Sequence, residues 1–207
     1  MSDFDCQDVT ICLEEIFCAV WVKVVYCFKK SKNEKWGDSE MEIQMLSRDY
    51  EIRKLTEDDI EAVYNLCMGN PLYYEYCPPL ITREQIKEDM QALPRGVVPE
   101  SKYYIGFFKG SLLIAVMDLI DGYPQKEIAF IGLFMMNRSV QGKGIGTSII
   151  DRACDTFAKS GYHSVRLAWV KGNPQSEHFW LKNQFKILKE TKSTVAQEVI
   201  LAERALQ

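Results

Sequence analysis

The sequence predicts a mixed α/β fold in which helices cover both faces of one mostly antiparallel sheet. Two strand-like segments joined by a Lys-Gly turn precede a strand–helix–strand unit along the chain. Strands joined by a tight turn pair antiparallel, whereas strands joined by a helical crossover pair in parallel. A sheet with both kinds of pairing needs helices on its faces to bury its apolar side chains.

The first elements of the main segment are a strand and two capped helices. Residues Tyr50–Leu55 (YEIRKL) read as a strand. Thr56 is suited to cap the next helix, because the acids of TEDD then lie in its first turn, where the helix dipole favours them. Thr82 repeats this arrangement in TREQIKEDMQAL, and Gln85 completes a capping box. The stretch GNPLYYEYCPPL between these helices (residues 69–80) is rich in proline and aromatic residues and is predicted to be a loop.

The remaining segments alternate between strands and helices. KYYIGFF and SLLIAVMDLI flank Lys109-Gly110, which is a hairpin signal. EIAFIGLFMM is a further strand, GTSIIDRACDTFAKSG a helix and SVRLAWV a strand. A helix through PQSEHFWLKN and two final segments, FKILKE and AQEVILAERAL, complete the order. No internal repeat is visible.

Length, composition and charge limit what the protein is expected to bind. The 207 residues suffice for one well-cored domain with an extension, and 47% hydrophobic with 26% charged residues is ordinary for a globular protein. The net charge of −4 gives no field that favours nucleic acid or an anionic membrane, so neither partner is expected. Seven cysteines without a C-x-x-C pair, and only two histidines, predict no metal site and reduced thiols in a cytoplasmic protein.

The N-terminal segment reads as an addition to the main domain. Its apolar run, Ile16–Phe28, is too short to span a membrane and contains Lys23, and three aspartates precede it where a signal peptide would carry basic residues. The polar stretch Lys29–Glu40 follows. We therefore expect an extension over residues 1–46 and a domain over residues 47–207. The extension is expected to dock on the domain, to mediate self-association as a homodimer, or to be dispensable.

Three glycines lie within five positions where a strand passes into a helix: Gly142, Gly144 and Gly146 in NRSVQGKGIGTSIIDRACDTF. A glycine-rich turn that leads into a helix exposes backbone N–H groups and the positive end of the helix dipole to an anion. Side chains at these positions would hinder that approach. The alternative is a tight turn with close helix packing.

Two familiar phosphate-binding loops do not fit. The dinucleotide fingerprint requires glycine or alanine where Thr147 stands, and an acid at the end of the next strand, where Lys171 stands. The mononucleotide P-loop requires its lysine after the last glycine, but Lys143 precedes it.

The pattern Q-x-x-G-x-G (Gln141, Gly144, Gly146) after an apolar strand resembles the acetyl-CoA loop of the GNAT superfamily of N-acetyltransferases. A second segment, NPQSEHFWLKNQF, resembles the later pattern of that superfamily. Its matching positions are Asn173, Phe179, Trp180, Lys182 and Phe185. With the order of elements, the resemblance covers roughly residues 50 to 205.

The resemblance implies a site for acetyl-CoA and no metal. The strand before the loop would present backbone groups to the pantetheine arm, and the loop would hold the pyrophosphate through main-chain N–H groups. Asn173 would contact the cofactor or brace the second helix. The residues so assigned to acetyl-CoA are Phe134, Met135, Met136, Gln141, Gly142, Lys143, Gly144, Ile145, Gly146, Thr147 and Asn173.

Two positions depart from the family pattern. Trp180 stands where the family usually has a tyrosine whose hydroxyl protonates the departing thiolate, and an indole N–H has no labile proton to give. Trp180 is therefore either a hydrogen-bond donor at the catalytic site or a packed core residue. Gln184 stands where glycine is usual and is expected to affect a turn.

The catalytic base and the acceptor pocket are less clearly marked. Glu127, at the start of the strand before the loop, is the nearest candidate for the carboxylate that deprotonates the amine; Asp118 and Asp121 are alternatives, and His178 is expected to be a surface residue. The family's first helix–loop–helix walls the acceptor side. In LYYEYCPP the tyrosines Tyr73, Tyr74 and Tyr76 therefore either line an amine pocket or pack the segment onto the sheet.

The resemblance implies transfer of the acetyl group of acetyl-CoA to a primary amine of a small molecule or peptide by direct attack. The alternative is a catalytically weak acyl-CoA-binding or regulatory module of the same fold, for which Trp180 is the main support. A weaker third reading is a self-associating structural protein organised by the apolar N-terminal run.

A chain that begins at Met41 should be soluble and should bind acetyl-CoA, because every expected element of the domain lies after the polar stretch. Calorimetric titration with acetyl-CoA on the full and shortened chains measures this. Insolubility, or loss of the cofactor site in the shortened chain, would show that Ile16–Phe28 belongs to the core.

Overall fold

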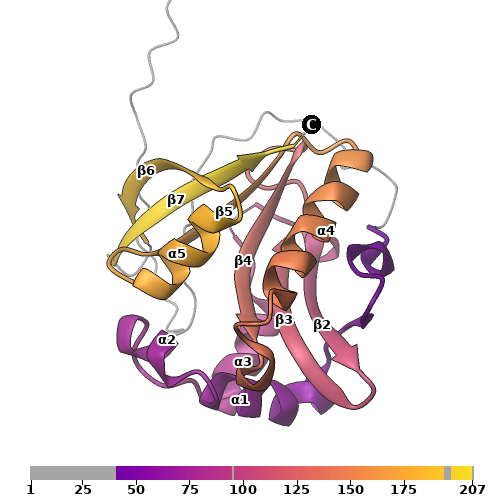
Figure 1. Cartoon of the computed structure of the whole chain (residues 1–207), viewed down its shortest axis with the longest axis vertical. Helices are drawn as coiled ribbons and strands as arrows, with labels where there is room; N and C mark the ends of the chain where they lie inside the picture. The colour runs from indigo at the N-terminus through magenta and orange to yellow at the C-terminus, as the bar shows by residue number, and fades with distance from the viewer. Residues whose placement is uncertain (1–40, 95, 194–196, 207) are drawn as a thin grey trace, which may run out of the picture.

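The computed structural model describes residues 41–94, 96–193 and 197–206, and the predicted mixed α/β fold is confirmed (Figure 1). Across these residues the sheet has seven strands in the order β1-β2-β3-β4-β5-β7-β6. Neighbouring strands pair antiparallel except β4 and β5, which pair in parallel and are connected by α4. The apolar run and the polar stretch of the N-terminal segment lie outside the described residues.

Apart from the short helix α2, the strands and α-helices follow the predicted order. The strands are β1 (Glu51–Lys54), β2 (Lys102–Lys109), β3 (Leu112–Ile120), β4 (Ile128–Met136), β5 (Ser164–Val170), β6 (Lys186–Lys192) and β7 (Glu198–Ala205). The α-helices are α1 (Ile60–Met68), α2 (Pro71–Tyr76), α3 (Arg83–Gln91), α4 (Ile145–Lys159) and α5 (Pro174–Lys182). Short 3-10 helices are η1 (Ile43–Leu46), η2 (Glu57–Asp59), η3 (Pro99–Ser101) and η4 (Arg138–Val140).

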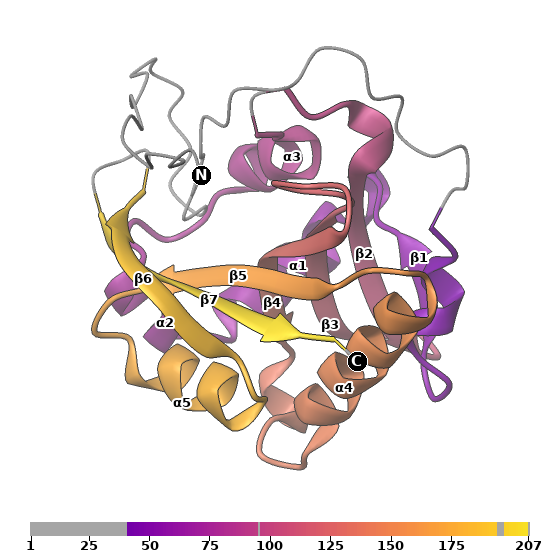
Figure 2. The same ribbon diagram turned by 90° about the horizontal axis from the view of Figure 1, so that it is seen from above.

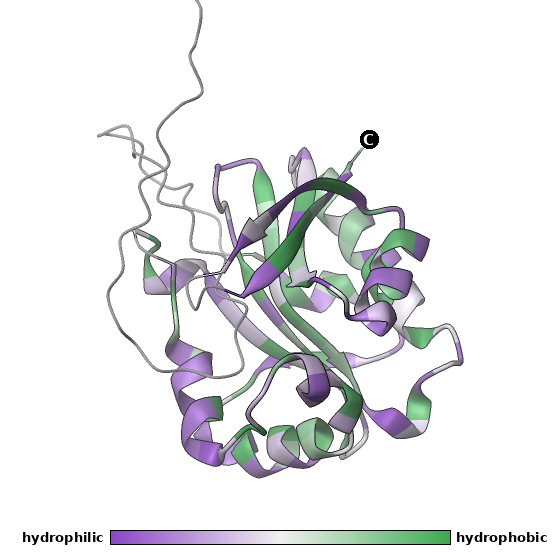
Figure 3. Ribbon diagram, turned by 90° about the vertical axis from the view of Figure 1, so that its left-hand side faces the viewer, coloured by the Kyte–Doolittle hydropathy of each residue, from purple (hydrophilic) through white to green (hydrophobic). Residues whose placement is uncertain are grey.

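Helices lie on both faces of the sheet, as Figure 2 shows, with α1 and α3 on one face and α4 and α5 on the other. Alternate residues of β2 point to opposite faces. Tyr103, Ile105 and Phe107 join the cluster under α4, whereas Tyr104 and Phe108 join the cluster under α1 and α3. Because both faces are covered, β2 and β3 are buried along almost their whole length, and Figure 3 shows long green stretches on strands of the sheet.

The parallel pairing of β4 and β5 stops before either strand ends. It runs from Ile128 opposite Ser164 to Ile131 opposite Leu167, after which β4 and β5 each continue without pairing to one another. On the other side of β4, the register with β3 skips Gly132, which is therefore a β-bulge residue. A bulge bends its strand and increases the local twist. The two strands thus diverge from the point where Gly132 lies.

The predicted capping box of α3 is confirmed. The Thr82 main-chain N–H donates to Gln85 Oε1 at 2.9 Å, and the Gln85 N–H donates to Thr82 Oγ1 at 3.2 Å. At Thr56, the main-chain N–H donates to a carboxylate oxygen of Asp59 at 2.9 Å. These contacts satisfy N–H groups that the first turn of a helix leaves without partners.

The prediction of a loop over residues 69–80 was wrong in part. Residues Pro71–Tyr76 form the short helix α2, which proline begins at its first position. Proline fits there because the first turn does not use its missing N–H, and its fixed φ suits a helix. Six residues are too few to show the helical period of apolar side chains, which is why the sequence pattern did not reveal this helix.

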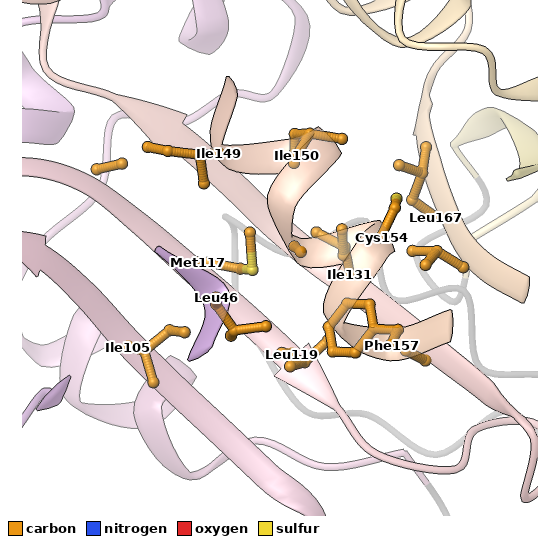
Figure 4. Packing of buried hydrophobic residues seen from close by; sticks show 14 of the residues in the cluster. Leu46, Ile105, Met117, Leu119, Ile131, Ile149, Ile150, Cys154, Phe157 and Leu167 are labelled. Atoms are coloured by element: carbon orange, nitrogen blue, oxygen red, sulfur yellow. The ribbon is translucent and has the colours of Figure 1, made fainter. Parts of the chain in front are cut away.

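Residues just before the predicted domain pack into it. Leu46 of η1 is fully buried in the cluster under α4, where Figure 4 shows it near Met117, Leu119 and Phe157. The hydroxyl of Thr156 on α4 also donates to a main-chain carbonyl of η1 at 2.9 Å. Residues 41–46 therefore pack with the domain, while the role of the residues before them stays a prediction.

A buried ion pair joins β2 and β3 on the α1 face. Lys102 Nζ lies 2.8 Å from Asp118 Oδ1, and their side chains are 4% and 0% exposed. Burial raises the pKa of Asp118 to about 6, although the Lys102 ammonium opposes that rise. Removing one member of such a pair leaves the other charge buried without compensation, which costs about 3–5 kcal/mol.

We therefore expect Asp118→Leu and Lys102→Met each to lower the free energy of unfolding by about 3 kcal/mol. The double variant Lys102→Met/Asp118→Leu should lose less than either single variant, because it leaves no uncompensated charge. Urea unfolding at pH 7 measures all three. Losses in the double variant equal to the sum of the single losses would contradict this account.

Candidate active site

A cleft of about 400 Å³ opens between β4 and β5 where the two strands diverge. Its floor consists of residues 131–136 of β4 and 167–170 of β5. The loop after β4, the segment around α2 and helix α5 form its walls. The wall residues are Asn70, Tyr73, Cys77, Val140, Gln141, Gly142, Gly144, Gly146, Thr147, Asn173, Gln175, Ser176, His178, Phe179, Trp180 and Lys182.

The glycine loop carries left-handed backbone at two of its three glycines. Gly142 has a φ of +74° and Gly144 a φ of +78°, and a Cβ added to either would meet no heavy atom within 4 Å. Glycine is therefore required there by conformation, while the space beside the backbone stays open. Upstream, Asn137 Oδ1 accepts from the Ser139 N–H at 3.0 Å and shapes η4.

Glycine is required at position 146 for a different reason, which is the close packing of two helices. A Cβ at this position would lie 3.2 Å from Cε2 of Phe179, so this glycine lets α4 approach α5 closely. The sequence left two interpretations of the glycine cluster open, and each applies to part of it. The backbone is open to a ligand at Gly142 and Gly144, and the helices pack closely at Gly146. Helix α4 is 15 residues long and begins at Ile145, directly after Gly144. Its first-turn N–H groups and the positive end of its dipole therefore lie at the glycine loop, which forms one wall of the cleft. That arrangement suits a phosphate group.

Asn173 caps the second helix at the cleft. Its Oδ1 accepts a hydrogen bond from the Ser176 N–H at 3.1 Å, and the residue is only 2% exposed. Of the two roles that the sequence left open for Asn173, bracing α5 is the one that these contacts support.

Aromatic rings hold α5 against β4. The ring of Trp180 packs edge-on to Phe179 and Phe185, with centroids at 4.9 and 5.2 Å, and its centroid lies 6.1 Å from that of Phe134. Trp180 is 7% exposed and also lines the cleft. It is therefore a packed side chain and a wall of the site at once. Gln184 follows with a φ of +67°, so the departure from glycine does fall in a turn with left-handed backbone.

The three tyrosines of the α2 segment point to different places. Tyr73 lines the cleft. Tyr74 is 5% exposed in the cluster under α1 and α3, edge-on to Tyr73 at 5.2 Å. Tyr76 lies outside the cleft lining, and its main-chain carbonyl accepts from Gln197 Nε2 at 2.7 Å. The structure thus brings only Tyr73 to the site.

Several other predicted site residues do not line the cleft. The exposed Glu127 precedes β4 at the end remote from the loop, and its main-chain carbonyl accepts from the His163 N–H at 2.8 Å. Met136 lies nine positions further along the chain, at about 3.3 Å per strand residue. Lys143 is exposed and donates from Nζ to the carbonyl of Ser139 at 3.0 Å. Ile145 packs against the cluster under α4.

Four side chains that titrate line the cleft within the described part of the chain: Tyr73, Cys77, His178 and Lys182. Burial raises the pKa of the Tyr73 hydroxyl and of the Cys77 thiol, so both stay protonated near neutral pH. His178 is exposed on α5, as expected, but it also faces the site, which the sequence pattern did not indicate.

Sequence reasoning also missed Asn70 and Gly132. Asn70 carries no motif, and its tie to the loop crosses 71 positions of sequence. Gly132, inside an apolar strand, was a usable signal, because an isolated glycine in a strand often marks a bulge.

Neither a metal-binding cluster nor a membrane-spanning helix is found among the described residues. No group of three or more His, Cys, Asp or Glu side chains is placed to hold a metal ion there. Within the same part of the chain, no helix has the length and hydropathy of a membrane span.

A model of the acetyltransferase (GNAT) family matches residues 60–185. No curated protein matches the sequence. An acetyltransferase from Thermus thermophilus superimposes with a TM-score of 0.64 at 21% identity, over 77% of this chain and 98% of that one. The Salmonella typhimurium acetyl transferase that modifies the N-terminal serine of 50S ribosomal subunit protein L7/L12 gives 0.62 at 18% identity, over 78% and 98%. The PaiA N-acetyltransferase from Thermoplasma acidophilum, in complex with coenzyme A, gives 0.56 at 19% identity, over 76% and 99%.

The structural similarity shows a common fold, and the family model spans more than half of the chain, including all three walls of the cleft. The glycine loop at the start of α4 and the capped helix α5 are the segments in which the sequence patterns were found. The chain therefore belongs to the GNAT family of acetyltransferases and is an acetyl-CoA-dependent N-acetyltransferase.

Proposed function

We propose that the enzyme transfers the acetyl group to a primary amine by direct attack within the cleft between β4 and β5. The observation that carries this proposal is the cleft itself, which joins an anion-suited loop at one wall to the tyrosine of α2 and the histidine of α5 at the others. A thioester supplies an activated acetyl group, so an amine that is deprotonated and held beside it needs no nucleophile from the protein.

The loop from Gln141 to Gly146 would hold the pyrophosphate of acetyl-CoA. The support is the left-handed backbone at Gly142 and Gly144, the open space beside both, and the N-terminus of α4 that follows. Phe134–Met136 would present backbone groups to the pantetheine arm, because this end of β4 does not pair with β5. Lys143 and Ile145 would contribute only their main-chain atoms, since their side chains are engaged elsewhere.

The acceptor amine would enter between α2 and α5. Tyr73 offers an aromatic face and a hydroxyl that stays protonated. His178 also lines the cleft, and a histidine side chain can act as a general base toward an amine. The N-terminal serine acceptor of the Salmonella enzyme makes a peptide amino terminus one suitable candidate beside small-molecule amines. Glu127 as the base stays a prediction, and the cleft geometry does not support it.

The experiment that tests this function is thiol release from acetyl-CoA in the presence of a panel of amines. The panel should hold free lysine, a polyamine, an amino sugar and short peptides with free amino termini. Release that requires one of these amines supports direct transfer. Binding of acetyl-CoA without release for any amine would favour the acyl-CoA-binding module instead.

Gly144→Val should abolish acetyl-CoA binding while the protein stays folded. A branched side chain is strained at a φ of +78° and would enter the open space beside the loop. Gly161→Val is the matched control, because Gly161 has a φ of +87°, has equally open surroundings and lies past the other end of α4. Calorimetric titration and thermal unfolding of both variants separate loss of the site from loss of the fold. Unchanged affinity in Gly144→Val would refute the assignment of the loop.

Trp180→Phe should retain most turnover, because phenylalanine keeps an aromatic ring in the packing and removes the indole N–H together with the smaller ring that carries it. A lost hydrogen bond typically costs about 1 kcal/mol, or roughly fivefold in rate. Trp180→Tyr restores the family's hydroxyl and should raise the rate at low pH. Trp169→Phe is a comparison variant, since it removes another indole that lines the cleft. A thousandfold loss of kcat in Trp180→Phe with intact acetyl-CoA affinity would show a transition-state role for the indole.

A further inference from the structure

We infer that Asn70 is a positioning residue that ties the acceptor side of the cleft to the acetyl-CoA loop. Asn70 lies between α1 and α2, is 7% exposed and lines the cleft. The inference rests on the proposed function of the loop, because it assigns a role to Gln141, the first residue of that loop.

The side chain of Asn70 uses both of its polar atoms. Its Nδ2 donates to the carbonyl of Leu66, in the last turn of α1, at 2.8 Å and to the carbonyl of Met136, the last residue of β4, at 3.1 Å. Its Oδ1 accepts from Nε2 of Gln141 at 2.6 Å. One amide thus joins α1, β4 and the loop, which are far apart in sequence.

The side chain of Gln141 is turned back into the protein. Its Nε2 donates to Met136 O at 3.0 Å as well as to Asn70 Oδ1, so both of its amide hydrogens are used. The side chain of Gln141 therefore anchors the start of the loop to Asn70 and to the end of β4. Gly142, which follows directly, has the left-handed backbone that opens the loop to a phosphate.

The main chain of Asn70 sets the start of α2. Its carbonyl accepts from the N–H of Tyr73 at 3.1 Å, in the first turn of the helix that places this tyrosine in the cleft. The neighbouring Gly69 lies beside η4, since a Cβ there would be in ordinary contact with Cβ of Arg138 at 3.9 Å. A movement of α2 is therefore transmitted through Asn70 to Gln141.

This geometry predicts that the two halves of the site are energetically coupled. Buried amide networks lose more than one bond when a member is removed, because the remaining polar atoms are left without partners. Ordering of the loop by acetyl-CoA should also order α2, and with it Tyr73. A residue that only stabilised the fold would not link these two events.

Calorimetric titration with acetyl-CoA tests the tie directly. Asn70→Ala and Gln141→Ala should each raise the Kd about tenfold, and the double variant should be little weaker than either, since both remove the same contact. Asn70→Asp should also bind more weakly, because its second oxygen would face the carbonyls of Leu66 and Met136. Asn65→Ala, at an exposed position on α1, is the control and should bind as the wild type does.

Hydrogen–deuterium exchange with and without acetyl-CoA tests the coupling. Bound acetyl-CoA should slow exchange in residues 71–76 of the wild type and of Asn65→Ala, and should not do so in Asn70→Ala or Gln141→Ala. Equal protection of α2 in all four proteins at saturating acetyl-CoA would mean direct shielding and would overturn the inference. If Asn70→Ala does not fold, Gln141→Ala breaks the same contact from the loop side.

The outcomes separate this inference from the function on which it rests. A wild-type protein that does not bind acetyl-CoA would remove the assignment of the loop. Wild-type binding with unchanged affinity and unchanged α2 protection in Asn70→Ala and Gln141→Ala would leave the function intact and overturn the role of Asn70. Additive losses in the double variant would likewise overturn the shared contact.

Discussion

The end of pairing between β4 and β5 is the constraint on which the rest of the structure depends. Past Ile131 and Leu167 the two strands share no backbone hydrogen bonds, and the bulge at Gly132 bends β4 where they part. Backbone groups in the middle of a sheet are otherwise paired. Here, part of one strand edge is left available to a ligand within a sheet that is otherwise closed on both faces. The position of this divergence decides where the cleft lies and which segments can wall it.

Separate contacts brace the two sides of the divergence. On the α5 side, rings of Phe134, Phe179 and Trp180 pack together, and Gly146 lets α4 approach them. On the α2 side, the contacts are hydrogen bonds between Asn70, Gln141 and the last carbonyl of β4. Apolar packing tolerates small displacements, whereas a buried amide network fixes distances and directions. The hydrogen bonds of Asn70 and Gln141 hold the start of the loop, whose backbone must present its N–H groups in a fixed orientation.

The titratable side chains of the cleft are consistent with the proposed direct transfer, in which no side chain has to act as a nucleophile. Cys77 and Tyr73 are held protonated by burial. Attack by the amine itself requires no cysteine nucleophile, and thiols ionise near pH 8.5, so the departing CoA sulfur depends only weakly on an acid. Trp180 can therefore stand where the family usually has tyrosine while its ring completes the wall of the cleft. The protein's main contribution would then be to align two substrates.

The sequence by itself determined the class of fold, the order of the strands and longer helices, the capping box at Thr82 and the glycine loop, because these depend on neighbours along the chain. It did not reveal α2, whose six residues are too short for a periodic signal. Only the tertiary structure decided which tyrosine reaches the cleft, that Glu127 lies at the end of β4 remote from the loop, and that Asn70 meets Gln141. These outcomes depend on where strands diverge and how segments distant in sequence pack, and no local pattern of side chains encodes that geometry.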